Sequence, residues 1–168
     1  MSTPEARVNE FADVGEALAG HGLSQLDSAE LDCAQVWVLP DPSWKASFGD
    51  EAFIREADDA LCLAREFQLD ARLYTLDEHP KQLFRKAAVP EWQLPVLVFL
   101  LDTARQVPVE IAAAYLIRFL GWLKSKGMRD EDRLHCRLLF RKSKGVVEID
   151  YDGPASEAPD IIDKLRKL

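Results

Sequence analysis

Residues 133–152 read RLHCRLLFRKSKGVVEIDYD, and this stretch decides the arrangement of the C-terminal part of the fold. In residues 133–141, polar side chains occupy four of the five odd positions, and apolar side chains occupy every even position. Residues 146–152 also alternate, with apolar side chains at 147, 149 and 151 and acids between them. Alternation with a period of two is typical of a β-strand that buries one face. With KSKG as a turn, the stretch predicts an antiparallel β-hairpin.

The register of this hairpin follows from its turn. A turn over residues 142–145 places the basic positions of the first strand beside the acidic positions of the second. Such cross-strand pairs stabilise a sheet by about 0.2–1 kcal/mol each. The expected neighbours are Arg141 with Val146, Arg137 with Asp150, and His135 with Asp152.

Strands and helices alternate through the rest of the chain. Short continuous apolar runs predict buried strands, whereas apolar residues spaced by three or four positions predict helices. The predicted strands are residues 36–39, 71–76 and 96–101, and the predicted helices are residues 3–18, 50–67, 79–88, 108–126 and 156–167.

This order of elements predicts an α/β fold. The expected architecture is a mostly parallel sheet that helices cover on both faces, with the antiparallel hairpin at one edge near the C-terminus. We interpret residues 1–168 as a single α/β domain, in which residues 1–34 form an N-terminal helical extension.

Composition limits the environment and the partners. The start of the chain has no apolar signal segment, and no apolar run reaches the roughly 20 residues of a membrane span, so a cytoplasmic protein without a membrane partner is expected. The three cysteines are far apart, which is typical of reduced thiols. A net charge of −8 disfavours nucleic acid as a partner, because a phosphate backbone requires a cationic surface.

Residues 118–144 depart from this acidic balance, because nine Lys or Arg against three acids give them a local charge of +6. One interpretation is a phosphate-binding ribbon in which Lys142, Lys144 and Arg137 contact the ligand. The other is a hairpin that neutralises its own charge through the acids of its second strand. Those acids, Glu148, Asp150 and Asp152, resemble an Mg²⁺ ligand set, but their basic neighbours disfavour a metal site.

The common catalytic motifs are missing from the sequence. His21, His79 and His135 are isolated, and no CxxC pair, P-loop, GxGxxG loop or GxSxG elbow occurs. We therefore assign no catalytic residue, no metal and no cofactor. Whether the protein is an enzyme stays open, and a non-enzymatic role is favoured.

Residues 36–101 carry the segments VWVLPDPSW, LYTLDEHPKQLFRKAAV and PEWQLPVLVFLL. A strand followed by a Trp-containing turn, a second strand ending in Asp, and a proline before a strong apolar strand resemble the thioredoxin-like family. The resemblance implies that Asp77, Pro80 and Pro95 mark positions of that fold, with Pro95 as its cis-proline.

The sequence departs from that family where the redox chemistry would lie. The family has Trp-Cys-x-x-Cys, whereas this chain has Trp44-Lys45-Ala46-Ser47-Phe48. Thiol exchange requires a thiolate, and no sulfur is present there. The resemblance therefore implies a non-redox member that binds a protein partner through the old active-site face. The implied partner-binding residues are Trp44, Phe48, Trp92 and Pro95.

The family's last strands have two possible counterparts. Either residues 106–111 form a strand and the hairpin is an addition, or the hairpin supplies the last two strands and Pro95 loses its cis-proline role.

Two hypotheses for function follow. The first is a non-catalytic protein-interaction or accessory module, and the second is a metal-assisted enzyme or binding protein that acts on phosphate-bearing substrates through residues 118–144.

Overall fold

The structure is a computed structural model. It describes residues 6–18, 31, 33–40, 52–54, 56–74, 81–83, 91–101, 107–142 and 145–168. The predicted site residues Trp44, Phe48 and Lys144 lie outside the described residues.

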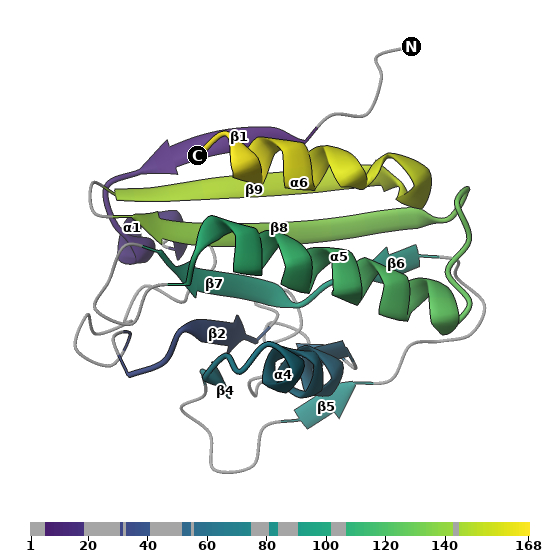
Figure 1. The fold of residues 1–168 in the computed structure, drawn as a ribbon, viewed down its shortest axis with the longest axis horizontal. Coiled ribbons are helices and arrows are strands. Elements are labelled where there is room, and N and C mark those ends of the chain that lie inside the picture. Colours follow the sequence, from purple (N-terminus) through teal and green to yellow (C-terminus); the bar gives the residue numbers. More distant parts are fainter. Residues whose placement is uncertain are drawn as a thin grey trace.

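The described residues form a mixed sheet of seven strands (Figure 1). Six of them lie side by side in the order β1 (Arg7–Phe11), β9 (Gly145–Pro154), β8 (Arg133–Lys142), β7 (Val96–Leu100), β2 (Val36–Leu39) and β4 (Ala71–Leu73). The seventh, β6 (Glu91–Gln93), pairs with β8 beyond the start of β7.

The α/β class is confirmed, but the expectation of a mostly parallel sheet was wrong. β2 is parallel to β4, and β8 is parallel to β7 and β6. In contrast, β7 runs antiparallel to β2, and the pairs β8–β9 and β1–β9 are also antiparallel. Apolar runs such as residues 96–101 indicate burial on both faces, and they carry no information about strand direction.

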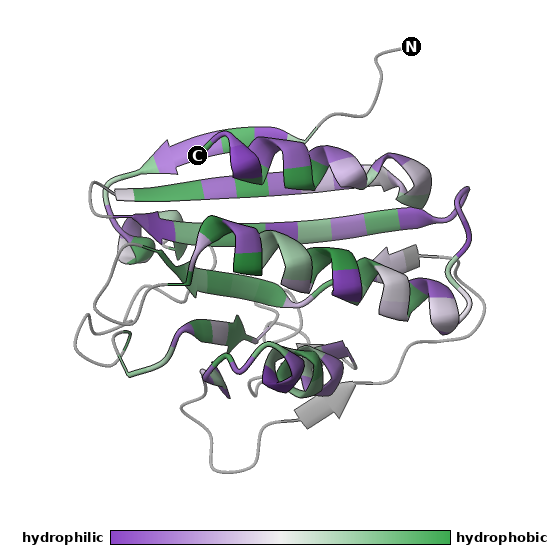
Figure 2. Cartoon of the chain, in the orientation of Figure 1, coloured by the Kyte–Doolittle hydropathy of each residue, from purple (hydrophilic) through white to green (hydrophobic). Residues whose placement is uncertain are grey.

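The longer helices all lie on one face of the sheet. They are α4 (Glu56–Glu66), α5 (Val109–Ser125) and α6 (Pro159–Arg166), and their apolar sides share one core with the hairpin and β7. The opposite face carries a smaller core that contains α1 (Val14–Leu18), Leu31 and Trp37. In Figure 2 the ribbon of β7 is hydrophobic throughout, whereas β8 and β9 alternate, as expected for strands covered on both faces and on one face, respectively.

The hairpin has the register that the sequence predicts. Arg141 lies opposite Val146 and Arg137 lies opposite Asp150. The even positions of β8 from residue 134 to residue 140 are buried in the core that contains α5 and α6, as the alternation indicates. The helices expected at 108–126 and 156–167 are α5 and α6, the latter preceded by a 3₁₀ turn, Ala155–Glu157.

Three predicted helices were wrong in part. Residues 7–11 form strand β1 of the sheet instead of the middle of a helix. The segments Ala52–Ile54 (β3) and Lys81–Leu83 (β5), also expected to be helical, pair with each other as a separate parallel sheet of two strands. In each case a strand of three to five residues takes its conformation from a distant partner, which local spacing does not encode.

Two details decide between the readings of residues 94–111. No cis peptide bond occurs among the described residues, so the Leu94–Pro95 bond is trans and Pro95 does not supply the cis-proline of the thioredoxin-like resemblance. Residues 109–111 are the first turn of α5, so they are not a strand, and β8 and β9 are the last strands of the sheet. None of the helices in the described part of the chain combines the length and hydrophobicity of a membrane span.

Candidate interaction surface at the edge strand

Three basic side chains of β8 are paired with the three acids of β9. Ion pairs join Arg137 to Glu148, His135 to Asp150 and Arg133 to Asp152. Each base contacts the acid two positions before its directly opposite residue in β9. The right-handed twist of paired strands brings such diagonal neighbours together. Arg133 and Arg137 are therefore neutralised within the hairpin, and each acid of the hypothetical metal site lies beside a basic side chain.

One of these pairs is buried and joins four elements, β8, β9, α1 and β1. The side chains of Arg137 and Glu148 are only 14% and 6% exposed. Arg137 Nη2 also donates a hydrogen bond to the carbonyl oxygen of Ala17 in α1, at 2.8 Å. The side-chain amide of Asn9 in β1 donates to Glu148 Oε1, at 3.0 Å. The guanidinium of Arg137, considered above for phosphate binding, is thus used inside the fold.

A second pair lies on the open part of the same face. Asp150 Oδ1 lies 3.4 Å from Nε2 of the exposed His135. The Oδ1 atom of Asp150 is buried and accepts no hydrogen bond among the described residues, so its contact with the imidazole is an ion pair. The nearby imidazole lowers the pKa of Asp150, and the charges of Arg137 and Arg7 lower it further, against the opposing effect of burial. Within the described residues, no three His, Cys, Asp or Glu side chains converge as metal ligands.

β1 is an edge strand of the sheet. Its one strand partner among the described residues is β9, so its other edge leaves backbone N–H and C=O groups unpaired by any strand there (Figure 1). Residues 7–10 are exposed, and Phe11 is half-buried. Val8, on the same face as α6, is 44% exposed and is one of two large apolar side chains that are exposed in the described part of the chain.

Contacts with distant residues hold β1 in place along its length. Just before its start, the N–H of Ala6 donates to Asp160 Oδ2 in α6, at 3.0 Å. In its middle, Asn9 donates to the buried Glu148. At its end, a Cβ built on Gly145 would lie 2.7 Å from the carbonyl oxygen of Phe11, so the two backbones approach closely only because residue 145 is a glycine. The edge that no described strand covers therefore belongs to an anchored strand.

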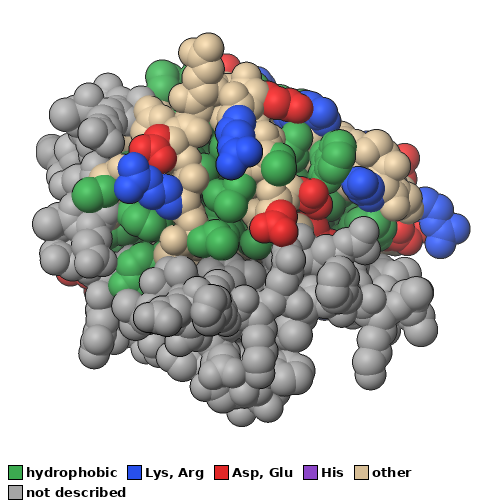
Figure 3. Space-filling view, turned by 90° about the horizontal axis from the view of Figure 1, so that it is seen from below, with side chains coloured by type: hydrophobic (Ala, Val, Ile, Leu, Met, Phe, Trp, Pro, Cys, Tyr) green, Lys and Arg blue, Asp and Glu red, His purple; other side chains and the backbone are tan. Residues whose placement is uncertain are grey.

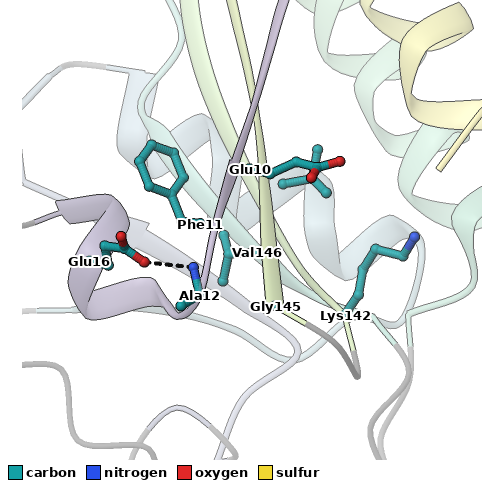
Figure 4. Close-up of a pocket in the computed structure, with 8 residues that line it drawn as sticks. Glu10, Phe11, Ala12, Glu16, Lys142, Gly145 and Val146 are labelled. Atoms are coloured by element: carbon teal, nitrogen blue, oxygen red, sulfur yellow. Dashed lines mark hydrogen bonds between the residues drawn. The ribbon is translucent and has the colours of Figure 1, made fainter.

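A hollow of about 520 Å³ lies at the end of β1, beside the tip of the hairpin (Figure 4). Its charged side chains are Glu10, Glu16 and Lys142, with Glu10 and Lys142 on one side of β1 and Glu16 on the other. Glu16 Oε2 accepts the N–H of Ala12, at 2.7 Å, which fixes the turn from β1 into α1. Two carboxylates against one ammonium make this hollow unfavourable for a phosphate group.

The predicted partner-binding residues that the structure describes contribute to packing. Trp92 is half-buried against the main core, and its indole N–H donates to Asp132 Oδ2, at 3.2 Å. Pro95 is buried.

Lys142 lies in the hollow, on the opposite face of β8 from Arg137, so these two members of the predicted phosphate site are not brought together. In Figure 3, seen from the β4 edge, the described basic and acidic side chains are interspersed.

Sequence reasoning missed the edge strand. Residues 7–11 read RVNEF, in which Val8 and Phe11 fit a helical spacing, and Thr3-Pro4 resembles a helix start. The signal that could have found it is weak, because five residues of mixed polarity fit a strand as well as a helix.

The three cysteines are free, as expected, with Cys33 and Cys62 exposed and Cys136 buried, where burial raises its pKa. No family model, curated protein or solved structure matches the chain.

Proposed function

We propose that the protein is a non-catalytic interaction module that accepts an extended segment of a protein partner along the free edge of β1. The observation that carries the proposal is the outer edge of β1, which no other described strand pairs with, on an otherwise anchored strand. Strand addition uses such edges, since main-chain hydrogen bonds supply affinity and the alternating side chains supply specificity.

Anchoring favours this mode of binding. A strand that is already fixed loses little conformational entropy when a partner pairs with it, so more of the interaction energy remains as affinity. The contacts of Ala6 with Asp160 and of Asn9 with Glu148 hold β1 on both sides of Val8. Arg7 and Glu10 place opposite charges on this short edge, and charges on an edge strand oppose indiscriminate pairing with other strands.

The competing hypothesis, a protein that acts on phosphate-bearing substrates through residues 118–144, has less support. Arg133 and Arg137 are paired with Asp152 and Glu148. Lys124 and Arg129 contact the acids of residues 130–132. At Arg137 a phosphate would have to displace a buried carboxylate, which is costly. At the exposed bases it would compete with carboxylates that are already in place, in pairs that contribute about 0–1 kcal/mol each.

Selection of extended peptides from a displayed random library on the full chain tests the proposal. Selected peptides are expected to slow hydrogen–deuterium exchange of the β1 amides. Successive residues of a strand direct their N–H groups to opposite edges, so one of Arg7→Pro and Val8→Pro removes only an outward donor. That variant should keep the wild-type melting temperature, because its pairing with β9 is intact, and it should no longer bind the selected peptides. Peptides that protect other segments, or that bind both proline variants as tightly as wild type, would refute the proposal.

A further inference from the structure

We propose that the segment bound at the β1 edge runs antiparallel to β1 and carries a basic residue opposite Glu10 and an apolar residue opposite Val8. In the partner's chain order, the basic residue therefore comes two positions before the apolar one. The inference rests on the proposed function, because it names the chemistry of the partner that the same edge accepts. Its support is the register of β1, the exposure of Val8 and the carboxylate of Glu10.

The register of β1 decides which side chains a partner strand meets. Directly opposite side chains of an antiparallel pair lie on the same face of the sheet, with Cβ atoms about 4.5–5.5 Å apart. Val8 and Glu10 pair with Ile149 and Val147 of β9, so both lie on the face that α6 covers. Antiparallel addition is expected because β1 and β8 both pair with β9 in that way, and such pairing is slightly more stable than parallel pairing.

Val8 favours an apolar neighbour. It is 44% exposed, whereas Ile149, its inward neighbour on the same face, is fully buried. Val8 thus lies at the rim of the core, and Figure 1 shows α6 running alongside β9 and β1. An apolar side chain opposite Val8 would extend this core by one strand and remove exposed apolar surface from water.

Glu10 favours a basic neighbour. Its side chain is exposed, and no hydrogen bond or ion pair joins it to another residue in the described part of the chain. The three acids of β9, in contrast, already lie beside bases of β8. The hollow at this end of β1 adds a second carboxylate, Glu16, against the one ammonium of Lys142 (Figure 4). The local charge therefore favours a cation.

The lysines nearby do not reverse this preference. Lys142 lies on β8, two strands inward from β1, and a partner strand would lie one strand outward. Neighbouring strands are 4.7–4.9 Å apart, so the partner's backbone would be roughly 14–15 Å from that of Lys142. Charges at that separation are largely screened at physiological salt. On α6, Lys164 already has an interaction within the fold, and Lys167 follows the buried Leu165 by two positions, which directs it to solvent.

Charge exchange tests the inference on the peptides that the displayed library yields. Those that protect the β1 amides are expected to carry Lys or Arg two positions before an apolar residue. Replacing that base by Glu should weaken binding to wild type by about threefold or more, whereas Glu10→Lys should bind the Glu peptide more tightly than the basic one. The four dissociation constants, measured by fluorescence anisotropy, form a double-mutant cycle that isolates the pair.

Glu131→Lys is the matched control. Glu131 is exposed in the turn before β8, away from β1 in the sheet order, and its replacement should leave the preference for the basic peptide unchanged. Glu10→Lys should keep the wild-type melting temperature, since Glu10 has no described ion pair or hydrogen bond to lose. Val8→Thr keeps the shape of the side chain, and it should reduce the preference for an apolar residue at the opposite position.

The outcomes separate this inference from the proposed function. Peptides that protect β1 without the base and the apolar residue, or with the base after the apolar residue, overturn the inference and leave the interaction module intact. A Glu10→Lys variant that still prefers the basic peptide also overturns it. A selection in which no peptide protects β1 overturns both proposals.

Discussion

Gly145 is the residue on which the junction between β1 and the hairpin depends. Its φ of +123° is strained for any side chain, and a Cβ would meet the carbonyl oxygen of Phe11 at 2.7 Å. We expect Gly145→Ala to lower the free energy of unfolding by about 1–3 kcal/mol and to accelerate hydrogen exchange of β1. Denaturant unfolding measures the first effect.

Gly121 provides the matched control for that replacement. It lies in α5, and nothing comes within 4 Å of a Cβ built on it. Gly121→Ala should therefore raise the free energy of unfolding by about 0.5–1 kcal/mol, through helix propensity alone. Equal effects of the two alanines would show that the contact between Gly145 and Phe11 is not a constraint.

The buried ion pair gives a second prediction at this scale. Glu148→Ala leaves the guanidinium of Arg137 buried without its carboxylate, and the expected loss of stability is about 3–5 kcal/mol. Glu66→Ala breaks the exposed pair with Arg118 and should cost about 0–1 kcal/mol. Thermal and denaturant unfolding of both variants would show whether burial makes this difference, and comparable losses would contradict it.

The elements differ in how far the sequence predicts them. The hairpin register could be predicted to the residue, because a period-two pattern on both strands and a short turn leave one alignment of charges. The ion pairs could not, because strand twist moves each base to the diagonal acid, from Asp150 to Glu148 in the case of Arg137. Residues 7–11 were assigned to a helix because their strand conformation depends on pairing with residues 146–150.

The sequence does not predict the candidate interaction surface at β1, for the same reason. Nothing in RVNEF marks an edge, since being an edge is a property of the sheet order rather than of the segment. The sequence instead directed attention to Trp92 and Pro95, whose size and rigidity suit a binding site but also suit the packed positions that they occupy.

The ion pairs of the hairpin make its stability depend on pH. The hydrogen-bonded Arg133 holds the pKa of Asp152 below its ordinary value of 3.8. A carboxylate with a lowered folded-state pKa adds stability above the unfolded value, and this stability is lost as the pH falls through the folded value. Stability should therefore decline below about pH 4. Asp152→Asn should be less stable than wild type at pH 6 and decline less on acidification.

The measurement is denaturant unfolding of both proteins between pH 6 and pH 3. Asp150 has a lowered pKa as well, through His135, so some decline is expected to remain in the Asp152→Asn variant. Parallel curves for the two proteins would mean that the pair of Arg133 with Asp152 contributes no pH dependence.

For the whole molecule, charge provides a test that separates the two hypotheses of function. The chain carries −8, and the bases of β8 at positions 133 and 137 are paired with acids of β9. We expect no retention on heparin at about 0.15 M salt, since few cations are free to release counterions from the polyanion. Lys142→Ala should leave the elution position unchanged. Retention at that salt concentration that weakens in the variant would favour the phosphate-binding alternative.

The pairing of β1 with β9 also has a consequence for synthesis. Asn9 and Glu148, which meet in the buried cluster, are separated by 139 positions. At about 5–20 residues per second, a ribosome needs roughly 7–28 s to make the intervening chain. During that interval Arg7–Phe11 lacks its native partner strand, and closing so long a loop places this step among the late and slow ones. Among the described strands of the seven-stranded sheet, β1 is thus the one that waits longest, as a nascent segment, for its native neighbour.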